Sequence, residues 1–158
     1  MDIKRILAPT DLSPLGEAGV QAAAELAQRL GARLILLYVV SPKELEEPAA
    51  PHALPKTVDQ IYETVQEKVL EQYRGVVPSI VRQGVSVETQ VVVGSPVMEI
   101  LTTARVKEAD LIAMGTHGRS GIARLVMGSV AEEVLRKAPC PVLTVRPQEQ
   151  ETLAQAAA

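Results

Sequence analysis

The sequence predicts an α/β protein in which a parallel β-sheet lies between two layers of helices. Five short apolar runs, each typical of a strand, alternate with four segments that carry apolar residues at helical spacing. The strand-like runs are apolar almost throughout, which indicates strands covered on both faces. Regular alternation of such strands with helices implies parallel pairing through right-handed crossovers. At 158 residues the chain has the length of one domain with a sizeable core.

The first part of the chain contains two of these strands and the helix between them. The first strand is expected at residues 3–8 and stops at Pro9. Ser13-Pro14 then resembles a helix N-cap followed by proline at the first helical position, and Gly31 ends the helical periodicity. Residues 34–40 are continuously apolar and are expected to form the second strand.

The middle of the chain is less regular. Residues 41–55 hold four prolines and an acidic cluster without periodicity, so a mobile surface loop is expected there, and the sequence leaves its role open. Apolar residues at helical spacing resume at Val58 and predict a longer helix. Gly75 and Pro78 weaken its later turns, so its end is expected between Gly75 and Gln83.

The remaining segments complete the alternation. Strands are expected at residues 85–93, 110–114 and 141–146, and helices are expected from Pro96 onward and at residues 129–137. Residues 1–147 are therefore expected to form the single domain. Residues 148–158 are polar and alanine-rich with nothing to bury, so a disordered or frayed tail is expected.

Composition and charge exclude several classes of function. Only 2% of the residues are aromatic and the net charge is −3, so the chain has neither the stacking rings nor the basic field of a nucleic-acid-binding protein. No apolar run approaches the length of a membrane-spanning helix and no cleavable apolar segment opens the chain, so a cytoplasmic location away from membranes is expected. Cys140 is the single cysteine, which excludes an intrachain disulfide and favours a small packed side chain over a reactive thiol.

A glycine-rich segment carries the strongest functional signal. Gly115-x-x-Gly118 is followed by nine residues and then by Gly128-Ser129, between the expected strand at 110–114 and the helix at 129–137. Glycine lets backbone N–H groups approach an anion closely, and the positive end of a helix dipole lies beside them. The spacing is neither the dinucleotide-binding G-x-G-x-x-G nor the P-loop pattern. The residues alone leave phosphate binding and a long connection with positive φ angles equally open.

Three segments are expected to meet at the carboxyl ends of the strands. Pro9-Thr10-Asp11 follows the first strand, Val39 lies near the end of the second, and the glycine-rich segment follows the fourth. Ligands of open parallel sheets bind at this edge, where the strand order reverses. Asp11 is therefore a candidate binding residue, with capping of the following helix as the alternative. His117 is expected to shape the loop rather than to act as a base or metal ligand, because no second His or close carboxylate accompanies it.

These residues resemble the ATP-binding branch of the universal stress protein family. The likeness covers residues 2–147 and is carried by residues 6–13 (ILAPTDLS), by the Gly115-x-x-Gly118 and Gly128-Ser129 motif, and by residues 138–143 (APCPVL). It implies a flavodoxin-like or Rossmann-like sheet with the strand order 3-2-1-4-5, and a homodimer. It also implies ATP held between the first and fourth strands, and a role in stress tolerance or signalling.

The resemblance further implies a set of nucleotide-binding residues, namely Pro9, Thr10, Asp11, Val39, Met114, Gly115, His117, Gly118, Arg119, Gly128, Ser129 and Val130. Asp11 and the main chain of Val39 would contact the base and ribose. Residues 128–130 would donate backbone N–H groups to the phosphates, which Gly118 and Arg119 would surround. ADP or AMP are alternatives to ATP, and Mg²⁺ or Mn²⁺ would be bound through the phosphates.

The sequence thus predicts a nucleotide-dependent sensor or interaction module with slow hydrolysis or none. It has no P-loop lysine and no local carboxylate pair that would activate water, and no catalytic residue is assigned. One alternative is an enzyme on the same fold, either a slow ATPase or an adenylate transferase. Adenylate-transferring enzymes of the related superfamily have a glycine-rich loop after the first strand, where this chain has no glycine.

The other alternative is a dimeric partner-binding protein with a vestigial nucleotide site. In the implied strand order the apolar strand at residues 141–146 lies at a sheet edge. Exposed apolar edges tend to pair with another strand, so antiparallel pairing of this strand with its twofold mate is the expected dimer contact. The sequence does not identify a downstream protein partner.

Overall fold

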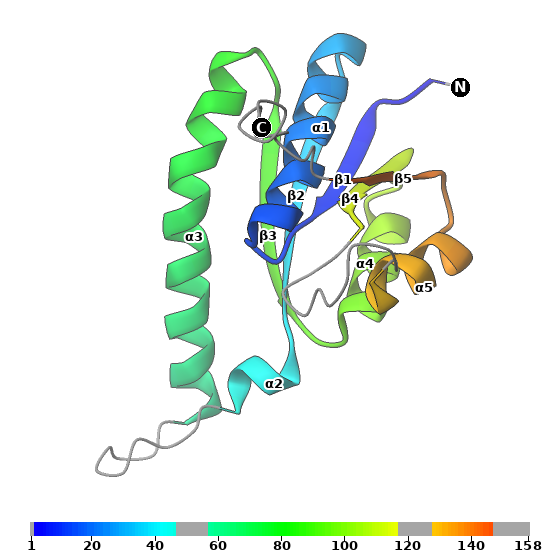
Figure 1. The fold of residues 1–158 in the computed structure, drawn as a ribbon. Helices are drawn as coiled ribbons and strands as arrows, with labels where there is room; N and C mark the ends of the chain where they lie inside the picture. The colour runs from blue at the N-terminus through cyan, green and yellow to red at the C-terminus, as the bar shows by residue number, and fades with distance from the viewer. Residues whose placement is uncertain (1, 47–56, 117–127, 147–158) are drawn as a thin grey trace, which may run out of the picture.

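A computed structural model describes residues 2–46, 57–116 and 128–146. These residues form one sheet of five parallel strands in the order β3-β2-β1-β4-β5 (Figure 1). The strands are β1 (Arg5–Pro9), β2 (Arg33–Val40), β3 (Val87–Val93), β4 (Leu111–Gly115) and β5 (Val142–Val145). The α/β class, the parallel pairing and the strand order expected from the sequence are therefore confirmed.

Helices cover both faces of the sheet (Figure 1). They are α1 (Pro14–Leu30), α2 (Pro42–Leu45), α3 (Val58–Arg82), α4 (Pro96–Val106) and α5 (Ser129–Lys137). On the face covered by α1 and α3, Ile6 and Tyr73 belong to one core cluster. On the face covered by α4 and α5, Leu7 and Val134 belong to the other. Neighbouring residues of β1 thus enter opposite cores, which explains why the strand is apolar throughout. No helix within the described ranges is long and apolar enough to cross a membrane.

The helix boundaries follow from local sequence signals. At the start of α1 the Ser13 hydroxyl oxygen accepts a hydrogen bond from Gly16 N at 3.1 Å, and Gly31 ends the helix with a φ of 64°. The predicted helix at residues 129–137 is observed with the same bounds as α5. The strands differ from their expected bounds by one or two residues at their ends, because hydrogen-bonded pairing rather than hydropathy determines where a strand begins and ends.

The connection after β2 differs from the prediction. The sequence predicts a loop over residues 41–55, but Pro42–Leu45 form α2. The reason is local, because Glu44 Oε2 accepts hydrogen bonds from Ser41 N at 2.8 Å and Ser41 Oγ at 2.9 Å. Residues 47–56 of the predicted loop, and the predicted tail at 148–158, lie outside the described residues.

The long helix continues to Arg82, at the far end of the range that the sequence allows. Pro78 lies inside it and removes one main-chain donor. Both Pro78 and Gly75 lie on the exposed side of the helix, where water replaces lost hydrogen bonds.

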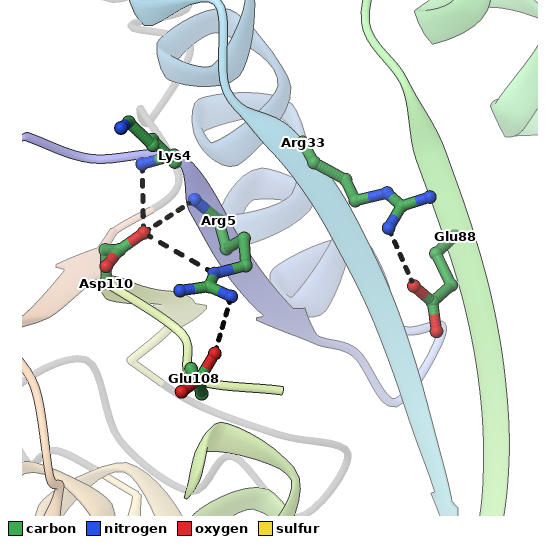
Figure 2. Close-up of polar contacts among 6 residues, drawn as sticks. All are labelled: Lys4, Arg5, Arg33, Glu88, Glu108 and Asp110. Carbon is green, nitrogen blue, oxygen red and sulfur yellow. Dashed lines mark hydrogen bonds and ion pairs between the residues drawn. The ribbon is translucent and has the colours of Figure 1, made fainter. Parts of the chain in front are cut away.

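Charged side chains tie the amino-terminal ends of the strands together (Figure 2). Asp110, directly before β4, accepts hydrogen bonds from the backbone N–H groups of Lys4 and Arg5, each at 2.9 Å. At the neighbouring strands, Arg33 of β2 pairs with Glu88 of β3 at 3.7 Å. These contacts join the amino-terminal ends of neighbouring strands, whereas ligands of open parallel sheets bind at the carboxyl-terminal ends.

We expect Asp110→Ala to lower the free energy of unfolding by about 1–3 kcal/mol, because two backbone N–H groups lose a charged acceptor. Chemical denaturation measures this loss. Glu108→Ala is a matched control, since it removes a carboxylate that is 75% exposed and pairs only with the Arg5 side chain among the described contacts. Its expected cost is below about 1 kcal/mol. Equal losses in the two variants would contradict the role given to Asp110.

Candidate functional site

The carboxyl-terminal ends of β1 and β4 separate and open a crevice. Pairing of β1 with β2 extends to Pro9↔Leu37, whereas pairing of β1 with β4 ends at Leu7↔Ile112. Beyond this point the chain leaves β1 toward α1, on one face of the sheet, while the chain that leaves β4 leads to α5 on the other face. Such a point, where successive connections leave toward opposite faces, is where open α/β sheets bind ligands.

A cavity of about 430 Å³ lies at this crevice, within the size range of small-molecule sites. Nine of the twelve residues that the resemblance implies line it: Pro9, Thr10, Asp11, Val39, Met114, Gly115, Gly128, Ser129 and Val130. The rest of its described lining consists of Gly16, Leu37, Tyr38, Ser41, Lys43, Glu44, Pro96, Ile100, Thr116 and Ala131. The other three implied residues, His117, Gly118 and Arg119, lie outside the described residues.

The end of β2 supplies an apolar wall and main-chain polar groups. Thr10 N donates to Leu37 O at 2.9 Å, the last hydrogen bond between the β1 and β2 segments. Successive residues of a parallel strand direct their main-chain groups to opposite neighbouring strands. Val39, two residues after Leu37, therefore faces the same side as Leu37, toward β1. The register gives Val39 no β1 partner in the described part of the chain. Together with Ile100 of α4, which also lines the cavity, this wall suits a flat, largely apolar group that also forms hydrogen bonds.

The turn after β1 holds the Asp11 carboxylate in place. Asp11 Oδ1 accepts hydrogen bonds from Ser13 N at 3.0 Å and from Ser13 Oγ at 2.6 Å. Thr10 Oγ1 accepts from Leu12 N at 3.0 Å, and Leu12 has a φ of 62°, in the left-handed region. Asp11 therefore supports the start of the helix and also lines the cavity. The two interpretations that the sequence offers for this residue are compatible.

The two ends of the glycine-rich segment are joined to each other. Gly128 N donates to Thr116 O at 2.7 Å, and Thr116 N donates to Val145 O at 3.0 Å. The Gly128 N–H group thus has an acceptor within the protein, and its donation to a phosphate stays a prediction. Ser129 and Val130 lie in the first turn of α5, where N–H groups have no acceptor within the helix and the dipole is positive. This end of the cavity therefore favours an anion.

Sequence reasoning missed the wall that α2 contributes. The Tyr38 hydroxyl donates to Glu44 Oε1, which fastens α2 to the buried β2 strand. Lys43 of α2 lines the cavity and is the one basic residue in its described lining. The signal was present in the sequence, because Ser41-Pro42 followed by Glu44 is a helix-start pattern. The surrounding prolines favoured the loop interpretation.

Neither a metal cluster nor an activated thiol is found in the parts of the chain that the structure describes. No group of three or more His, Cys, Asp or Glu residues there could hold a metal ion. Cys140 is partly buried and packs against the core cluster beneath α4 and α5. Burial, with the nearby Asp110 charge, raises the pKa of its thiol, although a hydrogen bond with the Ile112 backbone acts in the opposite direction. The thiol therefore stays protonated at neutral pH, as a packing role requires.

Fold and cavity together define a doubly wound α/β protein with a cleft of small-molecule size at its switch point. Residues 2–146 match the family model described as the Universal stress protein family. The chain belongs to that family.

Individual relatives agree with this assignment. Universal stress protein MJ0531 of Methanocaldococcus jannaschii is 34% identical over 148 residues, which cover 94% of this chain and 85% of that protein. The solved structure of universal stress protein UspA from Lactobacillus plantarum is similar with a TM-score of 0.79 and 27% identity, covering 92% of this chain and 99% of that one.

Two further solved structures are described with ligands. A universal stress protein in complex with cAMP has a TM-score of 0.67 and 24% identity, and covers 92% of this chain and 98% of its own. The Archaeoglobus fulgidus protein in complex with dAMP has a TM-score of 0.62 and 24% identity, and covers 92% of this chain and all of its own. At this level of identity both share the fold with the present chain.

Proposed function

We propose that this protein binds an adenine nucleotide in the cavity between β1 and β4 and acts as a nucleotide-dependent sensor or interaction module in a stress response. The observation that carries the proposal is the polarity of the cavity. Its lining combines apolar residues and main-chain groups of β2 with the amino terminus of α5. A nucleotide has the same polarity, with a flat base at one end and phosphates at the other. The family members described with cAMP and dAMP support this choice of ligand.

The base and ribose belong at the β2 end. Ile100 and Met114 offer apolar contact to the faces of a purine ring. The Val39 main chain offers a donor and an acceptor for its edge. The Asp11 carboxylate lies on the β1 side of the same space and accepts a hydrogen bond from a ribose hydroxyl.

The phosphates belong at the amino terminus of α5. The N–H groups of Ser129 and Val130 and the Ser129 hydroxyl donate to them, and the helix dipole favours their charge. Each hydrogen bond to a charged oxygen contributes about 1.5–3 kcal/mol, so three of them suit micromolar affinity. Mg²⁺ or Mn²⁺ arrives on the nucleotide and is bound through phosphate oxygens and water.

Hydrolysis is slow or absent in this proposal. The chain has no P-loop lysine to act on a γ-phosphate. The two carboxylates in the described lining, Asp11 and Glu44, are both hydrogen-bonded to neighbouring side chains. The missing lysine argues for binding and reporting rather than turnover.

We expect Ser129→Asp to weaken ATP binding at least tenfold, because a carboxylate at this position repels the phosphates, whereas aspartate suits a helix start and preserves the fold. Adenosine, which has no phosphate, should bind both proteins alike. Isothermal titration calorimetry measures both affinities.

Thr57→Asp is the matched control for the calorimetry. It places the same charge at the N-cap of α3, outside the lining of the cavity, and should leave ATP affinity unchanged. ATP binding that is insensitive to Ser129→Asp would refute the placement of the phosphates at the amino terminus of α5. Absence of heat with ATP, ADP and AMP would refute the function.

A homodimer through β5 is part of the proposal. The two edge strands of the sheet are β3 and β5. The β3 edge carries Glu88, paired with Arg33 and Lys107, and charged edges resist pairing. In contrast, β5 has the uncharged sequence Val-Leu-Thr-Val, and Leu143 is 37% exposed. Antiparallel pairing of β5 with the β5 strand of a second copy gives the main-chain groups of this edge hydrogen-bond partners.

We expect Leu143→Lys to convert the dimer to a monomer, because a buried unpaired ammonium group opposes strand pairing. Sedimentation velocity distinguishes the two states. Val81→Lys is the control, since Val81 is 52% exposed on α3 beside the opposite edge of the sheet. A persistent Leu143→Lys dimer, or a wild-type monomer, would exclude this interface.

A further inference from the structure

Two glycines of α1 lie too close to the cavity walls to carry a side chain. A Cβ atom added to Gly16 would lie 2.5 Å from Asp11 Oδ1. One added to Gly19 would lie 2.5 Å from Gly115 N and 2.8 Å from the Met114 carbonyl carbon. Real Cβ atoms do not approach heavy atoms this closely, so any larger residue at either position displaces the wall that it faces.

Helix stability alone does not explain these glycines. Glycine is less favourable than alanine inside a helix, because it loses more backbone freedom on folding. Gly75 in α3 offers the comparison, because a Cβ atom there would meet nothing within 4 Å. At Gly16 and Gly19 the space is already filled, and both filling groups belong to the cavity lining.

At Gly16 the affected group is the Asp11 carboxylate. Oδ1 is held by Ser13 N and Ser13 Oγ, and Gly16 N donates to the same Ser13 hydroxyl. The carboxylate therefore cannot withdraw from an added methyl group without breaking the hydrogen bonds that orient it.

At Gly19 the affected group is main chain. Met114 and Gly115 end β4, where they pair with Thr144 and Val145 of β5. An added methyl group therefore moves α1 away from β4, or displaces the main chain at Met114 and Gly115.

We propose that Gly16 and Gly19 are positioning residues for the nucleotide, an inference that rests on the function proposed above. Gly16 allows the Asp11 carboxylate to face the ribose. Gly19 brings α1 into contact with β4, which sets the main chain at Met114 and Gly115, two residues of the cavity wall.

The test compares Gly16→Ala, Gly19→Ala and Gly75→Ala by calorimetry with ATP and by chemical denaturation. Helix propensity predicts that all three stabilise the fold, whereas positioning predicts a difference between them. Gly75→Ala should raise the denaturation midpoint and leave affinity unchanged. Gly16→Ala and Gly19→Ala should each weaken ATP binding about tenfold, the equivalent of one charged hydrogen bond.

A double-mutant cycle with Asp11→Ala separates positioning from general damage. Gly16 acts through the Asp11 carboxylate, so the loss from Gly16→Ala should largely disappear in the Asp11→Ala background. Gly19 acts through the β4 main chain, so its loss should persist there. Folded variants that bind ATP as tightly as wild type would overturn the inference, as would a Gly16→Ala loss that is unchanged by Asp11→Ala.

Failure of the proposed function has a different signature. If the wild-type protein binds no adenine nucleotide, the positioning role of the two glycines is tested by the amide chemical shifts of the variants instead. Gly19→Ala should then shift the Gly115 and Thr116 amides and Gly75→Ala should not. Unchanged amide shifts in a folded Gly19→Ala protein would overturn the inference independently. If Gly19→Ala does not fold, Gly16→Ala is measured instead, and unchanged amide shifts at Asp11 and Ser13 would overturn the inference.

Discussion

The contact of α1 with the end of β4 is the constraint on which the rest of the site depends. Strands β1 and β4 pair only at their first positions and then diverge, so hydrogen bonding does not hold their carboxyl ends together. The α1 helix spans this gap and approaches Gly115 so closely that only glycine fits at Gly19. At the opposite edge, Asp110 joins the starts of both strands (Figure 2). The amino-terminal ends of β1 and β4 are thus joined by hydrogen bonds, and their separated carboxyl-terminal ends contact α1.

The aliphatic composition makes this arrangement possible. Small side chains along α1 let its axis lie close to the sheet, and the core contains only two buried aromatic residues among those described, Tyr38 and Tyr73. Tyr38 extends from β2 to Glu44 and fixes the short helix that closes one side of the cavity. The same interaction therefore links the buried sheet, the α2 wall and the space that receives the proposed base. A core rich in larger rings would keep α1 farther from β4 and widen the crevice.

Much of this structure was predictable from sequence, for identifiable reasons. Strands covered on both faces are apolar throughout, and Ser13 and Gly31 are strong helix boundaries, so the elements and the parallel sheet follow from local pattern. Alternation does not determine strand order, which came from the family resemblance. Site residues at strand ends were predictable because parallel strands share one carboxyl edge. Gly16 and Gly19 were not, because their role depends on the distance between α1 and β4, and a glycine within a helical pattern carries no sign of what lies beside it.

Chemical-shift mapping with ATP tests the central claim most directly, since it locates a ligand without assuming its site. A second cavity of about 330 Å³, lined in part by Ile61 and Val65 of α3, provides an internal alternative on the other side of Tyr38. The account predicts that saturating ATP shifts the amides of Asp11, Val39, Gly115 and Ser129 and leaves those of α3 unchanged. Shifts concentrated at α3, or no shifts at the ends of β1 and β4, would contradict it.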